Sequence, residues 1–163
     1  MSGEGRADAE TVEAKKAAVR LLAHRARPRS YLEERLRKRG FAAAAIQSAL
    51  DALAAAGYVN DRQYARDRIE GLLEKSLQWG PALVHRLMAD GMDPELAEEA
   101  VAERLAGEDQ RQWALQVARE RTETTDNENR EAERRRLGAY LSRRGFDTEV
   151  IVTIVEEVLS EAQ

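Results

Sequence analysis

The amino-acid sequence predicts an all-α protein made of three tandem three-helix, helix-turn-helix-like repeats. Its 163 residues are 43% hydrophobic but only 5% aromatic, with three prolines and no β-strand alternation of apolar and polar residues. A short pattern also occurs three times: leucines stand eight and four positions before a glycine, and a large apolar residue follows it. The three glycines are about 50 residues apart, a period typical of helical repeat arrays.

The repeated pattern predicts an opening helix, a tight turn and a closing helix in each repeat. Leucines four residues apart lie on one stripe of a helix. A glycine just past the last turn can adopt the left-handed conformation that ends a helix, which costs other residues about 1 kcal/mol or more. The three copies are Leu32/Leu36 with Gly40-Phe41, Leu83/Leu87 with Gly91-Met92, and Leu137/Leu141 with Gly145-Phe146.

A further helix is expected before the opening helix of each repeat. Residues 1–10 are polar and small, which predicts a disordered tail. Residues 11–26 carry apolar side chains at helical spacing, and Pro28 marks the break after them. The first repeat is therefore expected over residues 11–57, the second over 58–107 and the third over 108–163.

Helix boundaries are predicted from capping residues and from polar breaks. Two capping boxes, Ser30 with Glu33 and Asn60 with Gln63, are typical of helix starts. The polar residues 122–132 predict a loop or mobile linker. The remaining helices are expected at 43–56, 61–77, 95–106, 110–121, 134–142 and 148–160, with caps at Asp93-Pro94 and Asp147.

The net charge of −4 conceals a strong segregation of charge along the chain. Residues 15–39 hold ten lysines and arginines against two glutamates, and residues 134–144 hold five arginines and no acid. Residues 89–109 hold eight acids against one arginine, and residues 147–163 hold five acids and no base. Such runs indicate either solvated helix faces or a basic stripe that faces a polyanion.

The sequence offers no convincing catalytic or cofactor site. His24 and His85 stand on different predicted helices without a triad-like context, so both are interpreted as surface or boundary residues. Two histidines and no cysteine match no standard zinc spacing, and there is no glycine-rich phosphate loop. Trp79 and Trp113 are interpreted as packing residues. We therefore expect a protein that is not an enzyme and needs no metal or other cofactor.

Location is predicted from two further features. No cysteine is present, so no disulfide is expected, which fits a reducing compartment. No apolar run approaches about 18 residues, and the N-terminus lacks a hydrophobic signal core. We expect a cytoplasmic protein without a membrane partner.

Four stretches stand in a recognisable order and spacing: AVRLLAHRARPRSYLEERLRKRGF, AAAGYVNDRQYARDRI, WGPALVHRLMADGM and YLSRRGFDTEVI. Together they span roughly residues 17–155. In this order and spacing they resemble the RecX family of RecA recombinase regulators. The resemblance implies an elongated, curved array of repeats that lies in the groove of the RecA filament on single-stranded DNA. It also implies inhibition of ATP hydrolysis, strand exchange and coprotease activity, and hence roles in DNA repair, homologous recombination and the SOS response.

The basic residues of the outer repeats are the candidates for contact with the recombinase or with DNA phosphates. The second repeat departs from the pattern, because Ala89-Asp90 stands where the other repeats have Lys-Arg and Arg-Arg. We expect a monomer that contacts single-stranded DNA weakly or through the filament. The candidates are Arg25, Arg27, Arg29, Arg35, Arg37, Lys38, Arg39, Arg134, Arg135, Arg136, Arg143 and Arg144.

Two other functions remain open at this stage. One is a sequence-specific helix-turn-helix DNA-binding protein, although the helices after the glycine turns are rich in alanine and acids and poor in base-reading side chains. The other is a helical-repeat scaffold that binds an unrelated protein.

Overall fold

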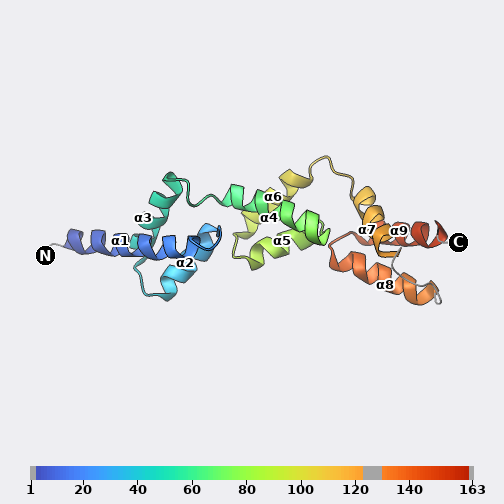
Figure 1. Cartoon of the computed structure of the whole chain (residues 1–163), viewed down its shortest axis with the longest axis horizontal. Coiled ribbons are helices and arrows are strands. Elements are labelled where there is room, and N and C mark those ends of the chain that lie inside the picture. The colour runs from blue at the N-terminus through green and yellow to red at the C-terminus, as the bar shows by residue number, and fades with distance from the viewer. Residues whose placement is uncertain (1–2, 123–129, 162–163) are drawn as a thin grey trace. The chain divides into compact units, whose positions relative to one another are not determined.

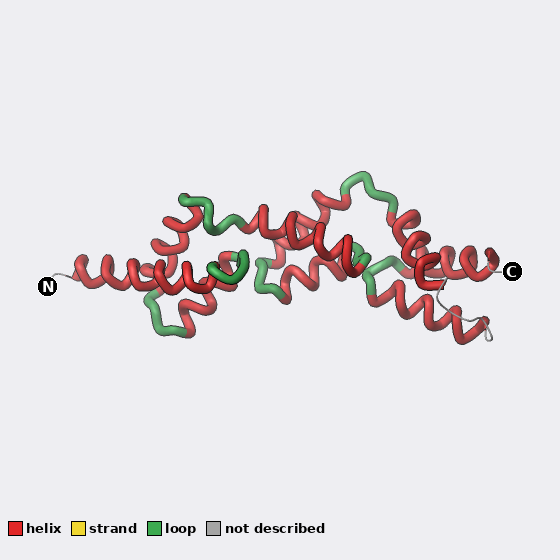
Figure 2. Tube along the Cα trace, viewed as in Figure 1, coloured by secondary structure: helices red, strands yellow, loops and turns green. Residues whose placement is uncertain are grey.

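The computed structural model describes residues 3–122 and 130–161, and all regular structure in these residues is helical (Figures 1 and 2). The prediction of an all-α helical repeat protein is confirmed. The helices are α1 (Gly3–Leu22), α2 (Arg29–Lys38), α3 (Ala43–Ala55), α4 (Asp61–Ser76), α5 (Gly80–Ala89), α6 (Pro94–Leu105), α7 (Gln110–Thr122), α8 (Arg130–Arg143) and α9 (Thr148–Glu161).

The chain divides into two compact units. Unit 1 contains Met1–Arg68 and Arg86–Ala100, and unit 2 contains Ile69–His85 and Val101–Gln163. The division passes through α4, α5 and α6, so the second repeat contributes to both units. The predicted repeat boundaries at residues 57 and 107 both fall in connectors between helices.

The predicted tail is wrong for residues 3–10, which form the first turns of α1; residues 1 and 2 lie outside the described part. Once residues 11–22 are helical, each added residue gains a backbone hydrogen bond without a new nucleation cost. The Glu10 carboxylate also accepts a hydrogen bond from the Ala42 backbone N–H at 2.7 Å, at the start of α3. The prediction of a tail was wrong because it used polar composition alone, whereas this helix packs against α3.

The polar loop predicted at 122–132 is shorter at both ends. Thr122 is the last residue of α7, and residues 130–132 belong to the first turn of α8; residues 123–129 lie outside the described part. The Thr122 hydroxyl donates to the Ala118 carbonyl at 2.8 Å, which suits a helical position. Glu131 and Glu133 place negative charge at the N-terminal end of α8, where the helix dipole favours it.

The two predicted capping boxes have different outcomes. The Asn60 side chain accepts a hydrogen bond from the Gln63 backbone N–H at 3.0 Å, which confirms the Asn60 half of the box, whereas the Gln63 side chain donates to Asp67 at 2.7 Å. At α2 the prediction is wrong, because the N-cap is Pro28 and makes no side-chain cap. Ser30 instead donates its hydroxyl hydrogen bond to the carbonyl of Gly91, in the glycine turn of the next repeat.

Each unit is built around its own apolar core. In unit 1 the leucine pair of α2 packs with Ile46, Leu50 and Leu53 of α3 and with alanines of α1. In unit 2 the leucine pair of α8 packs with Val117 of α7 and with the buried face of α9, as part of the cluster of Ala114, Val117, Ala118, Leu137, Leu141, Phe146, Ile154, Val155, Val158 and Leu159. Complete burial of such side chains stabilises a fold by about 1.5–3 kcal/mol each.

Aromatic packing completes the core of unit 2. Trp79 is only 7% exposed, and its ring stacks on Phe146 with centroids 6.1 Å apart. Trp113 lies 6.0 Å from Trp79 at a tilt of 46°. The interpretation of both tryptophans as packing residues is confirmed.

The three glycine turns share one backbone geometry. Gly40, Gly91 and Gly145 have φ angles of 87°, 93° and 90°, in the left-handed region that side chains rarely adopt. The backbone N–H after each glycine donates to the carbonyl of the second leucine, as in Phe41 to Leu36 at 3.3 Å. This is the Schellman arrangement, which satisfies carbonyls that the end of a helix leaves unpaired.

Two of these turns also pack tightly on the opening helix of the preceding repeat. A Cβ atom on Gly91 would lie 3.2 Å from the Cβ of Tyr31, and one on Gly145 would lie 2.9 Å from the Cβ of Ala82. The Trp79 backbone N–H donates to the Arg144 carbonyl at 2.7 Å beside the second contact. We call these contacts the glycine joints. Gly40 has no such neighbour and serves only the turn.

Candidate anion-binding interface

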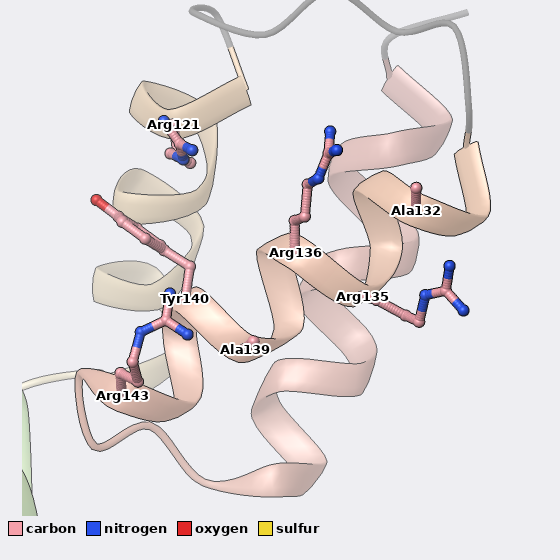
Figure 3. Close-up of a pocket in the computed structure, with 7 residues that line it drawn as sticks. All are labelled: Arg121, Ala132, Arg135, Arg136, Ala139, Tyr140 and Arg143. Atoms are coloured by element: carbon pink, nitrogen blue, oxygen red, sulfur yellow. The ribbon is translucent and has the colours of Figure 1, made fainter.

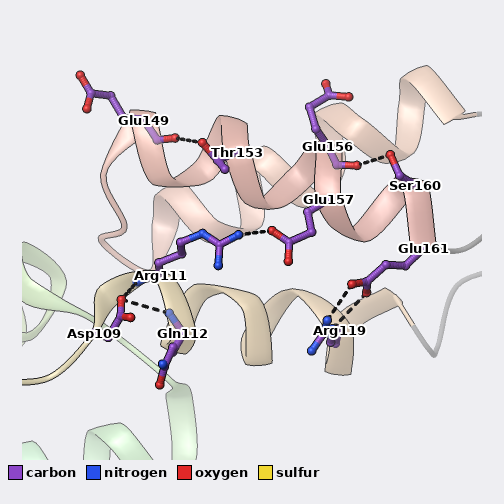
Figure 4. Close-up of polar contacts among 10 residues, drawn as sticks. All are labelled: Asp109, Arg111, Gln112, Arg119, Glu149, Thr153, Glu156, Glu157, Ser160 and Glu161. Carbon is purple, nitrogen blue, oxygen red and sulfur yellow. Dashed lines mark hydrogen bonds and ion pairs between the residues drawn. The ribbon is translucent and has the colours of Figure 1, made fainter.

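The acidic residues of the last helix are largely used inside their own repeat. Arg119 of α7 forms an ion pair with Glu161 of α9 at 2.7 Å, and Arg111 pairs with Glu157 (Figure 4). On the neighbouring helix, Arg134 lies 2.6 Å from Glu156. Much of the charge alternation along the sequence is therefore complementarity between helices of one repeat.

The second repeat is paired in the same way. Arg104 of α6 bonds to Glu70 of α4 and, at 2.9 Å, to Glu108. Arg62 lies 3.4 Å from Glu99. The exposed pairs contribute little to stability, about 0–1 kcal/mol each. The main consequence of these ion pairs is that Arg104 and Arg62 already have carboxylate partners and are less available to an external anion.

Arg29 is a structural residue of the first repeat. Its guanidinium contacts Asp51 at 2.7 Å, Gln47 at 2.7 Å and Glu33 at 3.2 Å. Burial alone would lower the pKa of Arg29, but hydrogen bonds to Asp51 and Glu33 outweigh it, so the pKa is raised. Of the candidate residues, Arg29 and Arg134 are thus held by carboxylates of their own repeat.

The first repeat keeps several cations without carboxylate partners. Arg25, Arg35, Arg37 and Arg39 are exposed, and within residues 3–122 and 130–161 none of them forms an ion pair. Arg27 and Arg35 lie over the Tyr31 ring, at 4.4 and 5.1 Å from its centroid. Lys38 is paired with Glu34, and this contact lowers the pKa of Glu34. We call Arg25, Arg35, Arg37 and Arg39 the repeat-1 basic face.

The third repeat gathers arginines around Tyr140. The Arg144 guanidinium lies 3.5 Å from the ring centroid and that of Arg121 lies 5.5 Å away. Arg135 and Arg143 are exposed, and in the part of the chain that the structure describes neither has a carboxylate partner. Among the described carboxylates, Arg136 reaches Glu133 alone, at 4.0 Å, and that carboxylate is buried.

These side chains border a surface pocket of about 440 Å³ on α7 and α8. Figure 3 shows Arg121 coming from α7, whereas the other lining side chains come from α8. The lining is Arg121, Ala132, Arg135, Arg136, Ala139, Tyr140 and Arg143. We call this site the α8 arginine pocket.

The structure therefore sorts the predicted site residues into distinct groups. Arg135, Arg136 and Arg143 come together in the α8 arginine pocket, whereas Arg144 packs on Tyr140. Sequence reasoning missed Arg121 and Tyr140. Tyr140 could have been found from the sequence, because it stands four residues before Arg144. Arg121 could not, because it reaches the pocket from another helix.

Catalytic and metal chemistry find little support in the described part. His24 and His85 are exposed, which confirms their interpretation as surface residues. No group of three or more His, Cys, Asp or Glu side chains among the described residues is arranged to hold a metal ion. Among the described helices, none combines the length and apolarity needed to cross a membrane.

Comparison with known proteins matches these repeats to one family. The profile described as "RecX, first three-helix domain" matches residues 14–53, and "RecX, third three-helix domain" matches residues 108–155. A "Regulatory protein RecX" from Amycolatopsis mediterranei is 31% identical over 148 residues, which are 91% of this chain and 84% of that protein. One from Mycolicibacterium smegmatis is 33% identical over 97% of this chain and 87% of its own length.

Solved structures show the same fold. The crystal structure of RecX from Lactobacillus salivarius superposes with a TM-score of 0.72 at 20% identity, covering 93% of this chain and 97% of that one. A second crystal structure, of a regulatory protein RecX, also gives 0.72, covering 90% of this chain and 73% of the other. With two domain profiles and relatives above 30% identity over most of its length, this chain belongs to the RecX family of regulatory proteins.

Proposed function

We propose that this chain is a negative regulator of a RecA-type recombinase that acts in the cytoplasm without catalysing a reaction. It binds the recombinase filament on single-stranded DNA, within the helical groove, and inhibits ATP hydrolysis, strand exchange and coprotease activity. The family name supports a regulatory role, and the resemblance of the repeats supplies the partner. The bound surface of the filament, acidic protein or DNA phosphate, is a polyanion.

One observation carries the proposal: among the described residues, exposed arginines of the first and third repeats have no carboxylate partner. Most cations that face an acidic helix are paired with it, as Arg111, Arg119 and Arg134 are with α9. The repeat-1 basic face, and Arg135 and Arg143 of the α8 arginine pocket, form no such pairs within the described residues. An exposed charge without an internal partner remains available to a polyanion.

The repeated design suits a filament. Weak contacts made by the first and third repeats on successive protomers multiply into a strong overall affinity, because the second contact forms at a high effective concentration. The middle repeat fits a spacer, since Asp90 stands where the other repeats carry a cation and is itself paired with Arg68 at 2.6 Å.

A sequence-specific helix-turn-helix function is less well supported. In that function the closing helix enters the major groove and presents its side chains to base edges. Here α9 would bring Glu156, Glu157 and Glu161 toward DNA phosphates, and all three are already paired with arginines of their own repeat.

The test is single-strand-dependent ATP hydrolysis by the cognate recombinase, titrated with the full chain. Inhibition at well below one molecule per recombinase protomer is expected if bound regulator blocks filament growth or promotes disassembly. A variant with Arg37→Gln, Arg39→Gln, Arg135→Gln and Arg143→Gln should lose most of the inhibition while keeping its helical circular-dichroism spectrum. No inhibition at several-fold excess, together with no binding to filaments, contradicts the proposal.

A further inference from the structure

The geometry points to the α8 arginine pocket as a site for the phosphodiester backbone of single-stranded nucleic acid, held without reading the bases. This inference rests on the proposed function, because it says which surface of this chain meets the DNA of the filament. It assigns phosphate contact to Arg135, Arg136 and Arg143 of the third repeat. We assign the repeat-1 basic face to contact with the recombinase protein of the filament.

The α8 arginines of the pocket are cations with little compensation from carboxylates. Arg135, Arg136 and Arg143 line one pocket, and within the described residues the only carboxylate in an ion pair with any of them is the buried Glu133, 4.0 Å from Arg136. Like charges gathered in this way repel one another, which disfavours the compact state. The nearby α7 and α8 arginines that face α9 are each matched with a glutamate. In the described part of the repeat, an anion bound at the pocket would therefore relieve a repulsion that the neighbouring arginines do not have.

The spacing of the α8 arginines suits a ligand with several anionic groups. Arg136 and Arg143 are seven residues apart on one helix, so they share a face and lie about 10 Å apart along its axis. One compact anion can contact both guanidinium groups only if the two side chains bend toward each other along the helix. A chain with regularly spaced anionic groups needs no such bending, and each planar guanidinium can bind a phosphate through two parallel hydrogen bonds.

The walls of the pocket suit a nucleic-acid backbone better than an acidic peptide. The pocket is formed by two helices, whose backbone N–H and C=O groups are used within the helices. A bound peptide would lose hydration from its own amides without finding partners there, at about 1–3 kcal/mol for each group left unsatisfied. Its large apolar side chains would find only two alanines and Tyr140. A phosphodiester chain carries no such amides.

The pocket offers little for the recognition of bases. Tyr140 is the only aromatic side chain in the pocket lining, and its ring is in contact with the guanidinium groups of Arg144 and Arg121. Base stacking on that ring would have to displace these cation–π contacts. Binding is therefore expected to be independent of sequence and strongly dependent on salt.

The experiment measures binding of the full chain to fluorescein-labelled oligothymidylate by fluorescence anisotropy over a series of KCl concentrations, without recombinase. The test variant carries Arg135→Gln and Arg143→Gln; the matched control carries Arg37→Gln and Arg39→Gln. Both lose two exposed charges that form no ion pair within residues 3–122 and 130–161. The test variant should bind on the order of tenfold or more weakly, while the control changes little. For the test variant, the slope of log affinity against log salt should be shallower by about 1.4, or 0.7 per phosphate contact.

Two competitors identify the ligand. An abasic phosphodiester oligomer should displace the labelled strand as well as oligothymidylate does, and polyglutamate of equal charge should not. Polyglutamate competing equally would overturn the inference in favour of an acidic protein ligand. Equal loss by both double variants, or no binding by the unmodified chain, would overturn it as well.

Two further readouts keep these outcomes interpretable. Neither Arg135 nor Arg143 has a carboxylate partner within the described residues, so thermal melting should show the test variant to be at least as stable as the unmodified chain. A chain that binds oligothymidylate but does not inhibit the recombinase contradicts only the proposed function. A chain that inhibits the recombinase but does not bind oligothymidylate contradicts only the pocket assignment.

Discussion

The backbone of Gly145 packs so closely on Ala82 that a Cβ atom added to the glycine would lie 2.9 Å from the alanine methyl. The Trp79 carbonyl is nearer still, and the Arg144 carbonyl beside it accepts the Trp79 N–H at 2.7 Å. The same glycine has a φ of 90°. Gly145 therefore satisfies two separate demands, a left-handed turn and a close approach of two segments of the chain.

Gly145→Ala should be far more destabilising than Gly40→Ala. Both substitutions force a side chain into a left-handed conformation, at about 1–2 kcal/mol. Only Gly145→Ala adds overpacking, which costs about 1–3 kcal/mol more. Urea unfolding followed by circular dichroism measures both, with Gly40→Ala as the matched control because a Cβ there meets open space. Equal losses would show that the glycine joint carries no packing strain.

Trp79→Ala should destabilise unit 2 by about 3–5 kcal/mol, because it removes a buried aromatic ring from a packed core. Trp113→Ala should cost clearly less, since Trp113 is only partly buried against the same cluster. Thermal melting compares the two variants. A smaller loss at Trp79 than at Trp113 would contradict the larger contribution assigned to the buried ring.

Arg29→Gln and Arg37→Gln should separate structure from binding. The first removes a guanidinium that joins Asp51, Gln47 and Glu33, so we expect a loss of about 1–3 kcal/mol in the free energy of unfolding. The second removes an exposed cation and should leave stability unchanged within about 0.5 kcal/mol. In recombinase inhibition the order should reverse when both variants are assayed at a temperature where each is folded. Arg37→Gln being the less stable of the two would contradict this division.

Asp61 should make the first unit less stable as the pH rises. Burial raises the pKa of Asp61 above its ordinary value, outweighing the hydrogen bond that its carboxylate accepts from the Arg29 backbone N–H at 2.8 Å. A raised folded-state pKa means that the protonated form is favoured by folding, so this contribution is complete below the unfolded pKa and is lost as pH rises through the folded pKa.

The matched variant for that prediction is Asp61→Asn, whose carbonyl oxygen can still accept the Arg29 N–H. At neutral pH the variant should equal or exceed the unmodified chain in stability. The difference should shrink as the pH falls below the raised pKa, where Asp61 becomes neutral too. Urea midpoints measured across the acidic range test this; an advantage of Asp61→Asn that grows on acidification would contradict the sign.

Sequence reasoning reached the fold because each repeat carries its own local signals. The leucine pair, the turn glycine and the apolar residue after it specify a helix, its end and the return of the chain, and these act over a few residues. The N-terminal tail was misjudged because helix propagation from residues 11–22 and the contact of Glu10 with Ala42 are not visible in local composition. Ser30 was misread because its partner, Gly91, lies 61 residues away along the chain.

Only part of the candidate site could be predicted from the sequence. A run of basic residues marks the helices that carry cations, and α2 and α8 were identified in this way. Which cations are neutralised depends on neighbours far along the chain, such as Asp51 for Arg29 and Glu156 for Arg134. Arg121 entered the pocket from α7, where no basic run pointed to it.

The glycine joints also bear on how such a chain can change its length. Each joint is made by a glycine turn and by one or two residues of the helix on which it packs, Ser30 and Tyr31 in one case and Trp79 and Ala82 in the other, so it places few demands on the rest of either repeat. Duplication of one unit of about 50 residues would copy both the glycine turn and the start of the opening helix on which the next glycine turn packs. Repeats joined in this way can diverge in charge, as the acidic middle repeat has, while the connection between them is inherited intact.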